Sequence, residues 1–133
     1  GPYAAVIPLF MDALLKGESP FINGDGEQSR DFTFVENAVQ ANIRGMFSQV
    51  EGAAGKVYNI AFGERTTVNE LYFNLKDLVD SDVNPTYREP RQGDVKDSLA
   101  DISKAKAFLG YNPQVDIRTG LGVTLEWFRK NFE

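Results

Sequence analysis

Residues 23–35, with the sequence NGDGEQSRDFTFV, restrict the possible folds more than any other stretch of the chain. They open with two turn dipeptides, Asn-Gly and Asp-Gly, in which glycine supplies the positive φ that a tight reversal needs. The apolar residues 32–35 predict a buried strand. Arg30 and Asp31 lie between the turn and this strand, where a charged side chain can point in few directions. The stretch therefore predicts a well-defined position for Arg30, suited to holding a ligand.

An alternative interpretation requires no ligand. Exposed charged side chains are mostly solvated, and surface ion pairs contribute little to stability. Arg30 could then simply pair with Asp31 or with Glu27 in the turn, and the stretch would be an ordinary strand entrance.

The composition restricts the possible functions. A chain of 133 residues with 42% hydrophobic and 25% charged residues is typical of one soluble globular domain. It contains no cysteine and no histidine, so we expect no disulfide, no metal site and no imidazole base, which fits a cytoplasmic location. The net charge of −5 predicts no nucleic-acid binding, and no apolar run is long enough to predict a membrane span. A few positioned arginines would have to hold any anion against this overall charge.

The apolar periodicity predicts five helices, two of which have recognisable N-terminal caps. Thr67 and Glu70, three residues apart, predict a capping box. Asp101 predicts a cap for a short helix that ends at Gly110. In chain order the predicted helices run from Ile7 to Lys16, over residues 36–49, from Thr67 to the break at Asn84 and Pro85, from Asp101 to Gly110, and over residues 117–132.

Short strands are predicted between the helices, at Phe21 and Ile22 and at residues 86–88. Residues 56–62, KVYNIAF, are almost all apolar and are followed by a glycine, which is typical of a strand buried on both faces of a parallel sheet. The order of elements predicts a helix-rich α/β domain. Because residues 56–62 are the only central strand expected, the chain resembles part of a larger sheet.

Residues 88–94, REPRQGD, form a second loop with binding chemistry. Arg88 and Arg91 flank a proline that stiffens the backbone, and Asp94 supplies an acceptor nearby. A planar guanidinium suits a phosphate, and a carboxylate suits the two hydroxyls of a ribose. A solvated loop is equally compatible with these residues.

Three other patterns are interpreted as coincidental. Tyr72 and Lys76 have the spacing of the catalytic pair of short-chain dehydrogenases, but Tyr72 lies in the apolar stripe of its helix and is predicted to be a core residue. The glycines of the turn lack the third glycine of a dinucleotide-binding motif and precede a strand rather than a helix. The aspartates of residues 94–101 do not have the spacing of a calcium loop.

Three stretches share their order and spacing with one family: residues 1–42, 57–71 and 87–111. They contain NGDGEQSRDF, VYNIAFGERTT and YREPRQGD. On these motifs the whole chain resembles the C-terminal part of the extended short-chain dehydrogenase/reductases, and within them the UDP-N-acetylglucosamine and UDP-glucose 4-epimerases. The same motifs recur in nucleotide-sugar dehydratases and decarboxylases.

The resemblance implies a UDP-sugar site built from separate segments. Its substrate-binding residues would be Ala5, Val6, Ile22, Asn23, Arg30, Arg91 and Asp94. The first four would hold the uracil, through the backbone of the first pair and the strand of the second. The two arginines would clasp the diphosphate, and the aspartate would accept from the ribose hydroxyls.

The family's NAD-binding motif and its catalytic tyrosine, lysine and serine or threonine precede the region that this sequence matches. The resemblance therefore implies that residues 1–133 are a C-terminal UDP-sugar-binding domain, without catalytic or cofactor-binding residues and without the N-terminal NAD-binding Rossmann domain. The parent would be an NAD-dependent epimerase and a homodimer, and the fragment alone would bind no NAD and be inactive. The alternatives are the same portion of a nucleotide-sugar dehydratase, a decarboxylase or a hexuronic acid epimerase, or a free-standing nucleotide-sugar-binding module.

Overall fold

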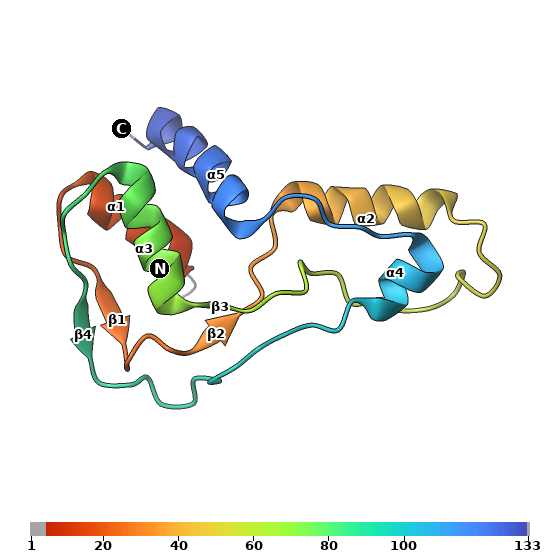
Figure 1. Cartoon of the computed structure of the whole chain (residues 1–133), viewed down its shortest axis with the longest axis horizontal. Coiled ribbons are helices and arrows are strands. Elements are labelled where there is room, and N and C mark those ends of the chain that lie inside the picture. The colour runs from red at the N-terminus through yellow and green to blue at the C-terminus, as the bar shows by residue number, and fades with distance from the viewer. Residues whose placement is uncertain (1–4, 133) are drawn as a thin grey trace. The chain divides into compact units, whose positions relative to one another are not determined.

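The computed structural model describes residues 5–132. Its elements in chain order are α1 (Val6–Leu15), β1 (Phe21–Asn23), β2 (Ser29–Arg30), α2 (Val35–Phe47), β3 (Thr66–Thr67), α3 (Val68–Val79), β4 (Thr86–Arg88), α4 (Ser103–Leu109) and α5 (Ile117–Asn131) (Figure 1). The backbone forms two compact units. The first comprises the described parts of Gly1–Arg30, Thr66–Asp97 and Leu121–Glu133, and the second comprises Asp31–Arg65 and Ser98–Gly120.

Helices α1 and α3 pack together in the first unit (Figure 1). The predicted capping box of α3 is confirmed, because the Thr67 hydroxyl accepts from the Glu70 N–H at 3.0 Å and the Glu70 carboxylate accepts from the Thr67 N–H at 3.1 Å. The rings of Phe10 on α1 and Tyr72 on α3 meet edge to face with centroids 5.3 Å apart, and both side chains are buried. Apolar packing between the two helices thus forms part of the core of this unit.

Two short strand pairs hold the loops of the first unit. β1 and β4 run parallel, and this register sets Asn23 beside Arg88. β2 runs antiparallel to β3. The chain beyond β4 returns to β2, where the buried hydroxyl of Ser29 donates to the Asp97 carboxylate at 2.8 Å. The segment that follows β4 is therefore fixed beside the end of β2.

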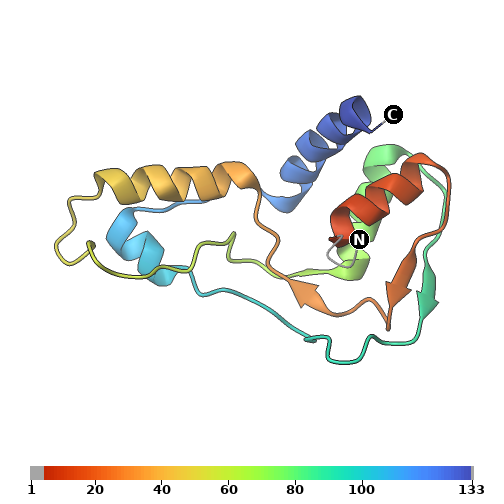
Figure 2. The same cartoon turned by 180° about the vertical axis from the view of Figure 1, so that it is seen from behind.

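In the second unit, α2 and α4 lie side by side, as Figures 1 and 2 show from opposite directions. The Tyr111 hydroxyl donates to the carbonyl of Ala61 at 2.6 Å, and burial raises the pKa of this tyrosine above its usual value. The buried apolar cluster of this unit comprises Ala41, Ala61, Ile102, Ala105 and Tyr111.

The predicted strand at residues 56–62 is not present as a strand. The segment has no regular secondary structure, and Val57 is 85% exposed. A strand requires hydrogen bonds from a neighbouring strand, and none of the strands described in residues 5–132 pairs with this segment. The predicted strand therefore does not form among the described residues, and its pairing with a larger sheet stays a prediction, although Ala61 does contribute to the buried cluster.

The predicted buried strand at residues 32–35 is wrong. The strand lies earlier, at Ser29–Arg30, and Val35 is already the first residue of α2, with 64% of its surface exposed. Phe34 occupies the N-cap position of α2 and packs closely against Gly120, where an added Cβ would lie 3.0 Å from the Phe34 ring. Apolar residues that precede a helix can pack in this way without any strand pairing.

The five predicted helices are present, four of them to within about two residues at each end, whereas α3 ends at Val79, before the predicted break at Asn84 and Pro85. Asp101 caps α4 through its carboxylate, which accepts from the Ser103 N–H at 2.9 Å, but Ile102 and not Asp101 occupies the N-cap position. Gly110 ends the helix with φ of 65°. The predicted apolar stripes, however, are only partly buried. Exposed members are Val39, Ile43, Met46 and Phe47 on α2 and Val123 and Trp127 on α5, whereas Leu121, Leu125 and Phe128 on α5 are buried.

The described residues thus form a helix-rich α/β fragment with two-stranded parallel and antiparallel sheets, which confirms the predicted class. None of the helices in residues 5–132 combines the length and the apolar character that crossing a lipid bilayer would require.

Candidate functional site

The glycine-rich turn between β1 and β2 is held by the first turn of α3. The Asn69 amide donates to the carbonyl of Asp25 at 3.0 Å and to the Glu27 carboxylate at 2.6 Å. The Tyr87 hydroxyl donates to the oxygen of the same amide at 2.7 Å. Asn69 was not identified from the sequence, because its partners in the turn lie more than forty residues away along the chain.

Gly26 is required by this arrangement. Its φ of 77° lies in the left-handed region, and a Cβ at this position would lie 2.1 Å from the side-chain oxygen of Asn69. The predicted turn at residues 23–26 is therefore confirmed, and Gly26 in addition leaves the space that Asn69 occupies.

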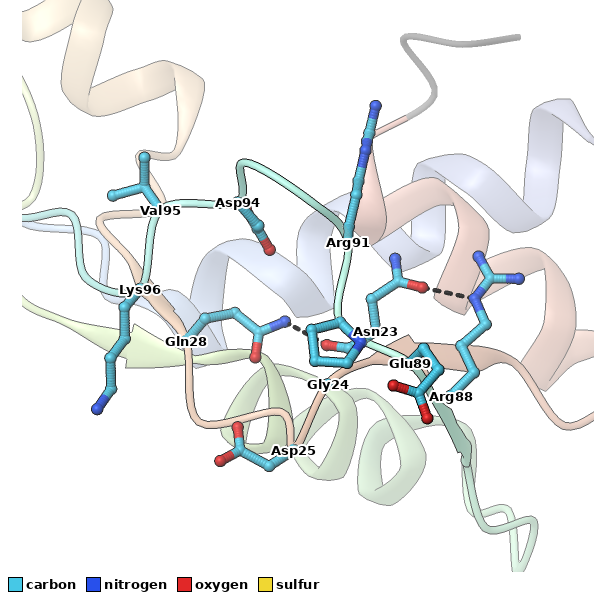
Figure 3. A pocket seen from close by; sticks show the side chains of 11 residues that line it. Asn23, Gly24, Asp25, Gln28, Arg88, Glu89, Arg91, Asp94, Val95 and Lys96 are labelled. Carbon is cyan, nitrogen blue, oxygen red and sulfur yellow. Dashed lines mark hydrogen bonds between the residues drawn. The ribbon is translucent and has the colours of Figure 1, made fainter.

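Asn23 and Arg88 form a contact across the parallel strand pair. The Nε of Arg88 donates to the side-chain oxygen of Asn23 at 2.5 Å, and the guanidinium carbon lies 4.7 Å from the centre of the Phe21 ring. The backbone carbonyl of Asn23 accepts from the Gln28 amide at 2.8 Å (Figure 3). Asn23 is thus fixed through both its side chain and its backbone.

Arg30 reaches the second predicted loop. Its Nη2 lies 2.7 Å from the Oδ1 of Asp94, and its Nη1 donates to the carbonyl of Ser29 at 2.6 Å. Both charged side chains are about one third exposed, so this ion pair contributes on the order of 1 kcal/mol or less. Arg30 therefore pairs with Asp94 and not with Asp31 or Glu27, the partners that the ligand-free interpretation of the sequence offered.

Arg91 and Asp94 occupy one tight turn, in which the Asp94 N–H donates to the Arg91 carbonyl at 3.2 Å. The Arg91 side chain is exposed and extends away from the Gln28 side chain in Figure 3. Because Asp94 bonds to Arg30, the structure brings Arg30 to the turn that carries Arg91, although the two arginines lie in loops about sixty residues apart.

A cavity of about 470 Å³ lies between the two loops of the first unit. It contains three predicted site residues, Asn23, Arg91 and Asp94 (Figure 3). Its charged lining is balanced, since it combines Arg88, Arg91 and Lys96 with Asp25, Glu89 and Asp94. The charged side chains of the lining therefore sum to zero, whereas the net charge of the whole chain is −5.

The other predicted site residues lie outside this lining, including Arg30, which reaches it only through its contact with Asp94. Ile22 is buried on β1, next to Asn23. Ala5 is exposed at the N-cap position of α1, and Val6 is the first residue of that helix. The Val6 N–H is one of the first-turn donors that a helix leaves without an intrahelical partner, so this backbone can still serve an acceptor.

The structure shows what the residues of two of the patterns interpreted as coincidental do. Tyr72 is fully buried, and its hydroxyl donates to the carbonyl of Val83, so it is a core residue. Asp97 accepts from Ser29, and Asp101 caps α4. Within residues 5–132 no cluster of acidic side chains has the arrangement of a metal site.

Asp31 has a structural role that the sequence did not indicate. Its two carboxylate oxygens accept from the backbone N–H groups of Phe62 and Gly63, at 3.0 and 2.9 Å. The conspicuous charged pair at residues 30–31 is therefore divided between two tasks: Arg30 contacts the loop of Asp94, and Asp31 anchors the end of residues 56–62.

Comparisons with known proteins show which family the chain is similar to. Residues 3–124 match the family model described as GDP-mannose 4,6 dehydratase. Among solved structures, the chain is 41% identical to a UDP-glucose 4-epimerase of Thermotoga maritima in complex with UDP-glucose, over 100% of this chain and 42% of that one, with a TM-score of 0.89. It is 43% identical to a UDP-N-acetylglucosamine 4-epimerase of Methanobrevibacter ruminantium in complex with UDP-N-acetylmuramic acid, over 99% and 41% of the two chains, with a TM-score of 0.88.

A third solved structure, MoeE5 in complex with UDP-glucuronic acid and NAD, is 32% identical over 97% of this chain and 42% of that one, with a TM-score of 0.86. The chain spans about 40% of the length of the curated relatives that it matches. The chain belongs to the extended short-chain dehydrogenase/reductase family of nucleotide-sugar epimerases and dehydratases, in which it corresponds to a portion of enzymes similar to the UDP-glucose and UDP-N-acetylglucosamine 4-epimerases.

Proposed function

We propose that this chain binds the UDP part of a nucleotide sugar and that it is the substrate-binding portion of an NAD-dependent UDP-N-acetylglucosamine or UDP-glucose 4-epimerase. The observation that carries the proposal is the meeting of Arg30 with the turn of Arg91 and Asp94 beside the cavity. The similar 4-epimerases, solved with UDP-sugars, support it.

Each proposed contact uses the chemistry of its side chain. Arg30 and Arg91 supply planar guanidinium groups for the two phosphates, and a charge-assisted hydrogen bond contributes about 1.5–3 kcal/mol. Asp94 supplies the acceptor for the ribose hydroxyls. To accept from them, its carboxylate would give up part of its present contact with Arg30. Asn23 and Ile22 on β1, with the backbone of Ala5 and Val6, hold the uracil end.

In this proposal the epimerisation itself is carried out by catalytic side chains and a cofactor that lie in the rest of the enzyme. NAD, which MoeE5 holds in its structure, would accept and return a hydride at the sugar. The present residues bind and orient the nucleotide, so that the sugar is held in one position during the reaction. The parent enzyme would be a homodimer with an N-terminal Rossmann domain.

The segment 56–62 fits this division of the enzyme. It is apolar, has no partner strand among the described residues, and exposes Val57. We propose that it completes the parallel sheet of the cofactor-binding domain, where it would gain the hydrogen bonds that a strand requires.

A dehydratase is the second candidate, because the matching family model is described as GDP-mannose 4,6 dehydratase. The portion formed by residues 1–133 would bind the nucleotide in the same way in either enzyme. The two are distinguished by the product that the full-length enzyme forms from a UDP-sugar, a 4-epimer or a 4-keto-6-deoxy sugar.

The test is a calorimetric titration of the chain with UDP. We expect weak binding, with a Kd on the order of millimolar, because much of the site belongs to the rest of the enzyme. Arg91→Ala should weaken binding at least about tenfold without changing the unfolding temperature, since this exposed side chain can lose its phosphate contact without disturbing the core.

Arg129→Ala is the matched control, because it removes the same charge from an exposed position on α5. It should leave UDP binding within about twofold. Equal affinities for wild type and Arg91→Ala would contradict the arginine assignment. Conversion of UDP-N-acetylglucosamine by this chain with NAD alone would contradict the division between binding and catalysis.

A further inference from the structure

Arg88 lines the cavity, and two contacts hold its side chain. It lies at the end of β4, in register with Asn23 on β1, and stacks over the Phe21 ring. Its Nε donates to the side chain of Asn23 at 2.5 Å, and both residues line the cavity. The sequence placed Arg88 in a loop whose guanidinium groups suit a phosphate, but Arg88 was not among the predicted substrate-binding residues.

The chemistry of this contact fixes the orientation of the Asn23 amide. An arginine side chain has hydrogen-bond donors and no acceptor, so the amide atom that faces it must be the oxygen. The amide nitrogen of Asn23 is therefore directed away from Arg88, as Figure 3 shows. Nδ2 makes no hydrogen bond to the residues that the structure describes, and it can only donate.

The backbone of Asn23 adds to this selectivity. Its carbonyl oxygen accepts from the Gln28 amide, so the acceptors of Asn23 are both engaged within the protein. What Asn23 offers to a ligand is consequently a neutral hydrogen-bond donor. A neutral donor suits the carbonyl oxygen of a pyrimidine base, whereas the charged oxygens of a diphosphate are better served by arginine.

We propose that Arg88 is a positioning residue for the nucleobase: it holds the Asn23 amide with Nδ2 toward the ligand, so that Nδ2 donates to a carbonyl oxygen of the uracil ring. This inference rests on the proposed function, since it requires the uracil end of UDP to lie at Asn23. Without Arg88 the amide can rotate and present its oxygen to the base, which places two acceptors against each other.

The experiment is a pair of titrations of the ¹⁵N-labelled chain, followed by NMR, with UDP and with inorganic pyrophosphate. In the wild type, the Asn23 side-chain resonances should shift with UDP and not with pyrophosphate. Arg88→Met keeps an unbranched chain over Phe21 and removes the donor. It should raise the Kd for UDP about three- to tenfold and leave the Kd for pyrophosphate within about twofold. Arg88→Lys, which restores a donor, should recover part of the UDP affinity.

Asn23→Asp separates positioning from a merely structural role. The carboxylate keeps the acceptor for Arg88 and strengthens that contact, but it has no donor for the base. UDP binding should therefore weaken more than pyrophosphate binding. If Asn23→Asp or Arg88→Met binds UDP as the wild type does, or if either loses UDP and pyrophosphate equally, the inference is wrong.

The outcome that would contradict the proposed function differs from the outcome that would contradict the role of Arg88. A wild-type chain whose spectrum responds to neither UDP nor pyrophosphate would remove both the function and the inference. A wild type that binds UDP, together with an Arg88→Met variant of equal affinity, would leave the function intact and remove the role of Arg88 alone.

Discussion

Individual side chains fix the loops of this chain mainly by bonding to backbone groups. Asn69 and Gln28 hold the turn beside the cavity through the carbonyls of Asp25 and Asn23. Such contacts order the loop without using the charges that a ligand needs. Arg91 remains exposed at the cavity, which is the condition for a residue that contacts phosphate.

Asp31 is the side chain for which we expect the largest effect on stability. Its carboxylate accepts from the N–H groups of Phe62 and Gly63, and hydrogen bonds to charged groups contribute about 1.5–3 kcal/mol each. Asp31→Ala should lower the free energy of unfolding by about 3 kcal/mol, measured by urea denaturation. Asp31→Asn keeps one acceptor and should lose about half as much. An Asp31→Ala variant as stable as the wild type would show that these bonds contribute nothing net.

At the scale of elements, the helix caps were predictable because their signals are local. Thr67 and Glu70 are three residues apart, and Asp101 lies two residues from its donor. The contact between Asn23 and Arg88, in contrast, depends on parallel pairing between strands 65 residues apart, which no local pattern indicates. The lack of a strand at residues 56–62 in the described chain has the same origin, since apolar composition does not identify a partner strand.

The α4 cap predicts a specific pH dependence. Hydrogen bonds from the side chain and backbone of Ser103 hold the pKa of Asp101 below its usual value of 3.8. A carboxyl whose pKa is lower in the folded state stabilises the fold above the unfolded pKa, and this contribution is lost as the pH falls through the folded pKa. Asp101→Ala should therefore be less stable than the wild type at neutral pH, and the difference should shrink below about pH 4.

Thermal unfolding monitored by circular dichroism at a series of pH values measures this difference. Ser103→Ala is the companion variant, because it removes one of the donors and should raise the pKa of Asp101 in an NMR titration. A difference between Asp101→Ala and the wild type that stays constant, or that grows with acid, would contradict the assigned cap.

At the scale of the whole molecule, the exposed apolar surface predicts association in solution. On helix α2, Met46 is 76% exposed and Phe47 is 73% exposed. Val57, in the segment 56–62, is exposed as well. Apolar surfaces of this kind mark interfaces or promote aggregation. Light scattering should show an average mass that rises with protein concentration.

Replacing Ile43 and Phe47 with lysine tests this expectation, because the two residues lie four positions apart on one exposed face of α2. The double variant should associate less and should unfold at about the same temperature. Val123→Lys, at a comparably exposed position on α5, is the control. A wild type that stays monomeric over a wide concentration range would count against an uncovered interface.

The most direct measurement is a crystal structure of this chain soaked with UDP. We predict that the two phosphates lie between the guanidinium groups of Arg30 and Arg91, with a ribose hydroxyl on Asp94 and the uracil at Asn23. A nucleotide bound with its phosphates away from both arginines, or with its base on the opposite side of Asp94 from Asn23, would contradict the account.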